Sequence, residues 1–207
     1  VISGCNIIVA GIPEAGKSEF GKYLSLYIPD NENVVTIEDA LEWYYKKLKP
    51  DAACISLKIN DVFSYREAIT LCMRLNPSRI LFTEVRSSEI EELAALWTSG
   101  VPGITTTHSG NYRSIPDRLI NLLENKNYSE QIENVGVVIK KRKNPDGTAT
   151  RYIDEIGFFE RVNKKNNCVD YMIKGTDVSN KLPDKILKKF EESNIKDPFY
   201  VDDNKKI

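Results

Sequence analysis

Cysteine and histidine are scarce in this sequence. Among 207 residues there are four cysteines and one histidine, and no two cysteines form a C-x-x-C pair. A structural zinc site needs four closely spaced Cys or His ligands, so the sequence cannot assemble one. Thiols without a pairing pattern also indicate a reducing compartment and disfavour a disulfide-stabilised secreted domain.

Long hydrophobic runs and an excess of one charge are also missing. No apolar run approaches the roughly eighteen residues of a membrane span, and no signal peptide is visible. Lys and Arg together number 29 and Asp and Glu number 30, so charge alone does not indicate a nucleic-acid or membrane surface. We predict no direct nucleic-acid binding. Because the first residue is Val1 and not Met, we expect the chain to be the later part of a longer protein.

Up to about residue 125, short apolar runs alternate with amphipathic segments. The apolar runs, predicted as strands, are 5–11, 34–39, 79–85 and 103–110. The amphipathic segments, predicted as helices, start at about Lys17 and cover 65–76, 88–100 with Ser88 as N-cap, and 115–125. This alternation predicts an α/β fold with a mostly parallel sheet flanked by helices, whose ligands lie at the carboxyl ends of the strands.

From about residue 134 the pattern changes to consecutive strands. The strand-like runs are 135–143, 148–162 and 168–174. The turn NPDG separates the first two, and the segment NKKNN (163–167), which we interpret as a linker, separates the last two. We therefore predict an antiparallel meander, followed by a helix over 183–194 and a loose tail from Asp197.

The stretch GIPEAGKS, residues 11–18, follows the first predicted strand and leads into the first predicted helix. It fits the phosphate-loop pattern G-x-x-x-x-G-K-[ST], in which backbone N–H groups surround a phosphate at a helix N-terminus. Lys17 would face the β/γ-phosphates and Ser18 would offer its hydroxyl to Mg²⁺. A glycine-containing turn that binds nothing is disfavoured by the strand before it and the helix after it. The predicted nucleotide-binding residues are Gly11, Glu14, Ala15, Gly16, Lys17, Ser18 and Glu19.

Carboxylates and the single histidine follow the other predicted strands. Glu84 ends an apolar strand and could reach Mg²⁺ or its water. Glu38, Asp39 and Glu42 follow another strand, where a carboxylate could orient the attacking water or merely favour a helix start. His108 could contact the γ-phosphate. Positive charge near these segments comes from Arg66, Arg74, Arg79, Arg86 and Arg113.

Four boxes in this order resemble the C-terminal ATPase domain of the type II/type IV secretion ATPase superfamily. The boxes are GIPEAGKS, VVTIEDALEW, RLNPSRILFTEVRSSEIEELAALWTSG and GITTTHSGN. The sequence is most similar to the VirB11-like and tight-adherence pilus branches, over about residues 1–125. The resemblance implies a RecA-like P-loop NTPase core over 1–133, with 134–207 continuing the same domain as a meander plus helix.

The resemblance also implies roles for individual residues. Lys17 and Ser18 would bind the phosphates of ATP and Mg²⁺, and Glu84 would be the Walker B acid that helps to hold the metal. Glu38 is implied as the catalytic glutamate and His108 as the γ-phosphate sensor. Arg74 and Arg86 match arginines that relay contacts between subunits in this family.

At the level of the whole protein, the resemblance implies an ATP-hydrolysing motor. It would work as a homohexameric ring, peripheral at the cytoplasmic face of a bacterial membrane, with membrane components of a secretion, pilus or conjugation apparatus as partners. Thr83 stands where the family usually has Gly, a departure that we expect to be tolerated although it could alter how closely the backbone approaches the ligand. The family's N-terminal domain is absent from this sequence, so we expect weak activity in isolation. Two alternatives stay open: a non-catalytic, nucleotide-binding ring component, and a P-loop kinase or GTPase of another family.

Overall fold

The computed structural model describes residues 1–207 except 88, 125–133, 179–181 and 196–207. In the described part, one sheet of nine strands has the order β3-β2-β4-β5-β1-β6-β7-β8-β9. The strands are β1 (Asn6–Ala10), β2 (Val34–Glu38), β3 (Cys54–Lys58), β4 (Arg79–Glu84), β5 (Gly103–Thr107), β6 (Asn134–Lys143), β7 (Ala149–Val162), β8 (Lys165–Ile173) and β9 (Thr176–Asp177). The helices are α1 (Lys17–Ser25), α2 (Tyr45–Leu48), α3 (Tyr65–Arg74), α4 (Glu89–Thr98), α5 (Ile115–Leu122) and α6 (Asp184–Glu192), with a short 3₁₀ helix at Tyr112–Ser114.

The sheet is parallel from β3 to β6 and antiparallel from β6 to β9. This confirms the predicted fold class, a mostly parallel sheet with helices and an antiparallel C-terminal part. One detail differs, because β6, expected as the first strand of the meander, pairs in parallel with β1. Val137, Val138 and Ile139 are all buried, which is typical of a strand covered on both faces of a parallel sheet.

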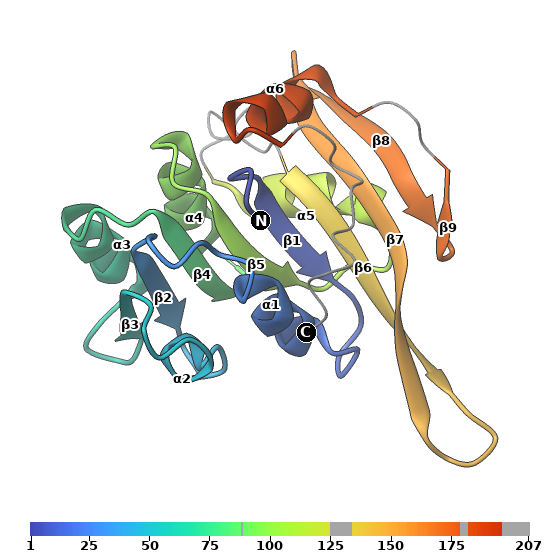
Figure 1. Ribbon diagram of the computed structural model, residues 1–207, viewed down its shortest axis with the longest axis horizontal. Helices are drawn as coiled ribbons and strands as arrows, with labels where there is room; N and C mark the ends of the chain where they lie inside the picture. The colour runs from blue at the N-terminus through green and yellow to red at the C-terminus, as the bar shows by residue number, and fades with distance from the viewer. Residues whose placement is uncertain (88, 125–133, 179–181, 196–207) are drawn as a thin grey trace.

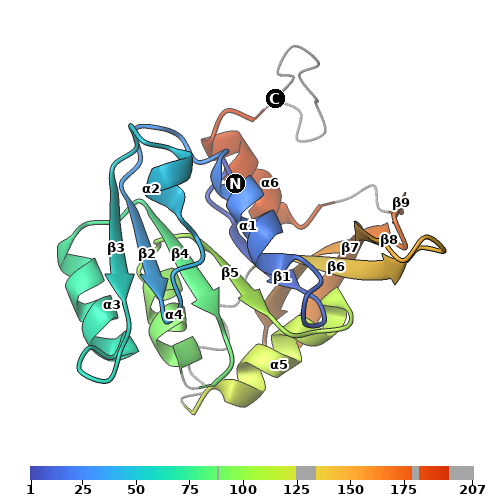
Figure 2. The same cartoon turned by 90° about the horizontal axis from the view of Figure 1, so that it is seen from below.

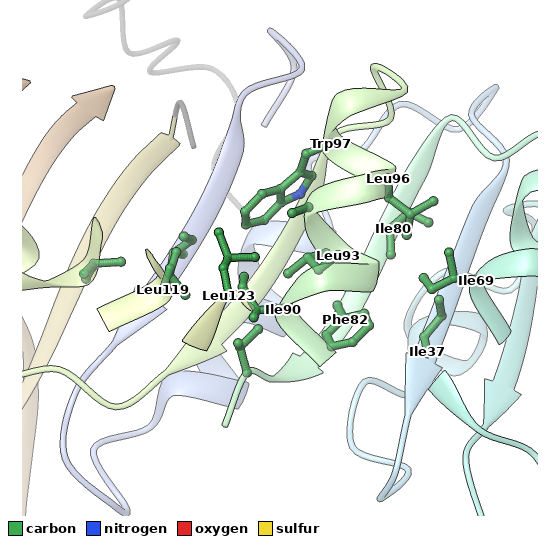
Figure 3. Close-up of a cluster of buried hydrophobic side chains, with 14 of the residues drawn as sticks. Ile37, Ile69, Ile80, Phe82, Ile90, Leu93, Leu96, Trp97, Leu119 and Leu123 are labelled. Atoms are coloured by element: carbon green, nitrogen blue, oxygen red, sulfur yellow. The ribbon is translucent and has the colours of Figure 1, made fainter. Parts of the chain in front are cut away.

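Helices cover both faces of the parallel strands. Figure 2 shows α3, α4 and α5 on one face and α1, α2 and α6 on the other. Under α4, the side chains of Leu93 and Leu96 lie beside Phe82 and Ile80 of β4 in one apolar layer (Figure 3). Such a buried core holds the carboxyl ends of the strands in place, where most of the predicted site residues lie.

Two segments between the predicted elements are regular in the structure. Strand β3 and helix α2 were not predicted, and β3 is a largely exposed edge strand with little apolar signal. The predicted linker at 163–167 is wrong, because Lys165 already pairs with Val162. Asn163 and Lys164 have φ values of 51° and 61°, as a two-residue hairpin turn with both central residues left-handed requires.

The turn after β5 is anchored to the antiparallel part of the sheet through Tyr112. Its ring is fully buried, and a Cβ added at Gly157 of β7 would lie 2.1 Å from it. The Tyr112 N–H donates to Glu155 at 2.8 Å, and its hydroxyl donates to Asp170. Burial and the bond to Asp170 both raise the pKa of Tyr112. The antiparallel strands thus position the segment that carries His108.

Two predictions, Ser88 as an N-cap and the loose tail from Asp197, fall outside the described residues. In the described part of the chain, no helix is long and apolar enough to cross a membrane.

Candidate functional site

The predicted phosphate loop joins β1 to the first turn of α1. Gly16 adopts φ 95° immediately before the helix, a left-handed conformation that favours glycine. A Cβ added at Gly11 would lie 2.5 Å from the backbone oxygen of Ile139 in β6, so only glycine fits there. Helix α1 has no side-chain cap, so its N-terminal N–H groups can bind an anion.

A cavity of about 640 Å³ opens at the loop, between the start of α1, the segment after β2, the end of β4 and the β6–β7 hairpin. The predicted residues on its wall are Glu14, Gly16, Lys17, Ser18, Glu19, Glu84 and Arg86. Ala15 is fully buried in the core beneath the loop, so only its backbone is available to a ligand. Of the two acids predicted to bind nucleotide, Glu14 and Glu19, the second forms an ion pair with Lys22 on the same helix.

Lys17, His108 and Glu84 are in contact although they come from three different elements. His108 Nδ1 lies 3.3 Å from Lys17 Nζ, and His108 Nε2 lies 2.7 Å from Glu84 Oε1. Arg86 extends this chain of contacts, because its Nη2 lies 3.0 Å from Glu84 Oε2. The structure therefore brings together the loop lysine, the strand-end acid and the histidine, as the sequence predicted for their elements.

Neighbouring charges contribute to the pKa shifts of Lys17 and Arg86. Lys17 is only 8% exposed. Burial lowers its pKa, the Glu84 carboxylate opposes this shift, and the Arg86 guanidinium adds to it. The hydrogen bond to Glu84 raises the pKa of Arg86. A buried ammonium beside a second cation is well suited to receive further negative charge.

A β-bulge in β4 sets the direction of Glu84. Leu81 lies opposite Ile104 and Glu84 lies opposite Thr106, so β4 has one more residue than β5 between these pairs. Thr83 occupies the bulge, and its carbonyl accepts a 2.7 Å bond from the Thr105 hydroxyl. Bulges near active sites commonly redirect a side chain.

The acids after β2 fall into two groups. Glu38 is 2% exposed, and its carboxylate accepts bonds from the Thr36 hydroxyl at 2.8 Å and from the N–H groups of Glu42 and Trp43 at 2.7 and 2.9 Å. It therefore holds the following loop and does not line the cavity. The catalytic role predicted for Glu38 stays a prediction.

Glu42 and Asp39, in contrast, face the cavity. Glu42 Oε2 accepts a 2.7 Å hydrogen bond from the Ser18 hydroxyl, the group predicted to meet Mg²⁺. Asp39 Oδ2 lies 3.8 Å from Arg86 Nη1. Sequence reasoning left the choice among these three acids open, and the resemblance alone indicated Glu38.

The structure does not bring Arg74 to the cavity. Arg74 is the last residue of α3, and the carbonyl of the next residue, Leu75, accepts a 2.9 Å bond from Asn33. Asn33 immediately precedes β2, so Arg74 lies at the amino ends of the strands, the opposite rim of the sheet.

Sequence reasoning missed several cavity residues, among them the basic residue Arg151. Arg151 of β7 lines the cavity, and its Nε donates to the carbonyl of Glu14 at 3.3 Å. Its position depends on the pairing of β6 with β1, which brings a distant hairpin over the loop. The basic run at 140–143 and Arg151 are the only sequence signals for this contact.

Comparison with known families places these features in context. A family model described as "Type II/IV secretion system protein" matches residues 2–156, which include the loop, the acids, His108 and Arg151.

Curated relatives match a shorter stretch. The type IV secretion system protein VirB11 of Bartonella quintana is 34% identical over 107 residues, which are 50% of this chain and 30% of VirB11. An uncharacterized protein of Bacillus anthracis, pXO2-25, is 30% identical over 117 residues, which are 56% of this chain and 26% of that protein. The matched part thus spans less than a third of these relatives.

Solved structures share the fold. The VirB11 ATPase of the Brucella suis type IV secretion system, crystallised with sulphate, has a TM-score of 0.64 and 26% identity, covering 75% of this chain and 48% of that one. The Legionella pneumophila ATPase DotB has a TM-score of 0.60 at 18% identity, covering 72% of this chain and 44% of that one. The second likeness concerns the fold alone.

Proposed function

The chain belongs to the type II/IV secretion system protein family, and we propose that it is the ATP-hydrolysing part of a bacterial secretion, pilus-assembly or conjugation motor. One observation carries the proposal. The loop lysine Lys17, the acid Glu84 and the imidazole of His108 are in contact at the ends of three neighbouring elements. This is the arrangement needed around a triphosphate, whose charge must be held from several sides.

The loop fits the phosphates of ATP. Gly11 and Gly16 allow the backbone to approach closely, and the uncapped start of α1 favours an anion. Lys17 adds a partly desolvated positive charge at the β/γ end. His108, in contact with both Lys17 and Glu84, would sense the γ-phosphate at the same place.

The site also fits Mg²⁺. Oxygen donors come from Ser18 and Glu84, which lie together on the wall of a small recess beside the main cavity. Among the described residues, no three His, Cys, Asp or Glu side chains form a metal cage, which suits an ion that is completed by phosphates and water. When bound, Mg²⁺ would neutralise charge on the phosphate oxygens.

We assign the positioning of the attacking water to Glu42. Its carboxylate lies on the cavity wall, 2.7 Å from the Ser18 hydroxyl, and accepts from a neutral donor. Glu38 would act through Glu42, because it binds the Glu42 N–H and thereby fixes the loop. This division of roles differs from the one that the resemblance implies.

Ring assembly at the inner face of the membrane is part of the proposal. The VirB11 relatives are named as type IV secretion system proteins, which supports a place in such a system, and the ring itself is what the family resemblance implies. Arg74 is exposed at the rim opposite the cavity, where it is accessible to a neighbouring copy. Arg86 is exposed beside Glu84 and would contact both the phosphates and that copy.

Phosphate release from Mg·ATP by the 207-residue chain tests the proposal. We expect slow release that Lys17→Ala and Glu42→Gln each lower by about 100-fold or more, because each removes a group that acts on the reacting phosphate or water. Arg142→Gln, a hairpin residue outside the cavity, is the control and keeps the wild-type rate. No release above background, together with no Mg·ATP binding, would refute the proposal.

Glu38→Gln separates the two carboxylates. The amide cannot accept three donors as the carboxylate does, so we expect a loss of about 2 kcal/mol in unfolding free energy and a smaller loss of turnover than for Glu42→Gln. If Glu38→Gln instead stops turnover without changing stability, Glu38 is the catalytic glutamate and our assignment to Glu42 is wrong.

A further inference from the structure

The β6–β7 hairpin contacts the phosphate loop through two basic side chains. Figure 1 shows the hairpin projecting past the end of the parallel strands. Lys141 and Arg151 are opposite each other in its register. Lys141 Nζ lies 3.1 Å from the Glu14 carboxylate, and Arg151 Nε donates to the Glu14 carbonyl at 3.3 Å. Together they hold Glu14, which has a left-handed φ of 60°.

The two cations differ in how their charge is balanced. Lys141 faces the carboxylate of Glu14. Within the described residues, no carboxylate lies within 4.0 Å of the Arg151 guanidinium, whose one hydrogen bond uses Nε and a neutral carbonyl. The N–H groups on the two terminal nitrogens of Arg151 are therefore available to donate to another partner. The residue lines the cavity, where such a partner would bind.

Contact with Gly16 places Arg151 at one end of the cavity. A Cβ added at Gly16 would lie 2.9 Å from Arg151 Cδ, so the arginine stem packs directly on the loop backbone. The backbone N–H groups of such a loop surround the α- and β-phosphates, whereas the lysine reaches the β/γ end. Lys17 and Glu84 each contact His108, and neither of these contacts involves Arg151.

We propose that Arg151 is a nucleotide-binding residue that donates to the α- and β-phosphates from the hairpin. This inference rests on the proposed function and identifies which part of the nucleotide the hairpin recognises. A planar guanidinium can make two parallel hydrogen bonds to phosphate oxygens. Since the α- and β-phosphates occur in both ADP and ATP, Arg151 contributes equally to the binding of each.

Calorimetric titration of the 207-residue chain with Mg·ADP and with a non-hydrolysable Mg·ATP analogue tests this inference. We expect Arg151→Gln to weaken both ligands by the same factor, about tenfold. Arg151→Lys keeps the positive charge but cannot make two parallel hydrogen bonds, so it should recover only part of the affinity. Arg142→Gln removes an equal charge from the same hairpin away from the cavity, and it should change neither affinity.

The outcomes distinguish this inference from the proposed function. If the wild-type chain binds both nucleotides and Arg151→Gln binds them equally well, the inference fails and the proposed function stands. Weakening of the ATP analogue alone would also overturn it, because Arg151 would then serve the γ-phosphate. If the wild-type chain binds neither nucleotide, both fail. Unchanged thermal unfolding of Arg151→Gln without nucleotide excludes a general loss of structure.

Discussion

The two sides of the nucleotide cavity are built differently. On one side, Glu84 ends β4 and His108 follows β5, both strands being buried, and His108 contacts both Glu84 and Lys17. On the other side, Arg151 comes from an antiparallel hairpin and is exposed, with one bond to the loop backbone. The first side is positioned by the core and the second by pairing of β6 with β1. Under the proposed function, the γ-phosphate would meet the side built on the core, and the α- and β-phosphates would meet the exposed hairpin side.

The largest expected effect comes from truncating a core side chain beneath the parallel strands, on the side of the cavity that carries Glu84 and His108. Leu93→Ala removes a fully buried side chain between α4 and β4, and we expect a loss of about 3 kcal/mol in unfolding free energy. On the hairpin side, Tyr152 is 39% exposed, so Tyr152→Ala should cost less than about 1 kcal/mol. Urea denaturation measures both. Similar losses would contradict the contrast between the two sides.

A smaller effect is expected where the two sides are joined. Gly157→Ala would force a methyl group into the Tyr112 ring, and we expect a loss of about 2 kcal/mol from overpacking. The matched control is Gly110→Ala, since a Cβ there would meet nothing within 4 Å. Denaturant unfolding of the pair gives the difference. Equal stability would show that Tyr112 does not tie the turn after β5 to β7.

The smallest effect concerns the start of α4 on the parallel side, where Glu89 accepts hydrogen bonds from the N–H groups of Arg86 and Ser87. Burial alone would raise the pKa of Glu89. The hydrogen bonds from the Ser87 side chain and from these N–H groups outweigh burial, so the folded pKa lies below 4.5. Its stabilisation is therefore present above pH 4.5 and lost as the pH falls through the folded pKa.

Glu89→Gln should lower the unfolding free energy by about 1 kcal/mol at neutral pH. The gap from the wild type should shrink as the pH falls below 4.5. Unfolding curves across this range measure it, and a gap that stays constant in acid would exclude the carboxylate as its cause.

Sequence reasoning worked where a physical pattern is local. Buried parallel strands are continuous apolar runs, so β1, β2, β4 and β5 could be predicted together with the polar residues at their ends. The exposed edge strand β3 has no such run and was missed. Asn163 and Lys164 form a tight turn without glycine, which explains the mistaken linker.

The site was harder to predict where distance along the chain matters. Arg151 lies more than a hundred residues from the loop, and no motif indicates which hairpin residue faces a cavity. Glu38 and Glu42 are both acids after one strand, and only the hydrogen bonds separate the buried one from the one that faces Ser18. Arg74 is part of a recognisable box, yet the length of α3 carries it to the opposite rim.

The central claim is that elements from both sides converge on one nucleotide. A crystal structure of the chain with Mg²⁺ and a non-hydrolysable ATP analogue tests it most directly. We predict the β-phosphate within residues 11–18, the metal at the Ser18 hydroxyl, the γ-phosphate near Lys17 and His108, and Arg151 at the α- and β-phosphates. A nucleotide bound away from this loop, or bound there without contact to Lys17, would contradict the account.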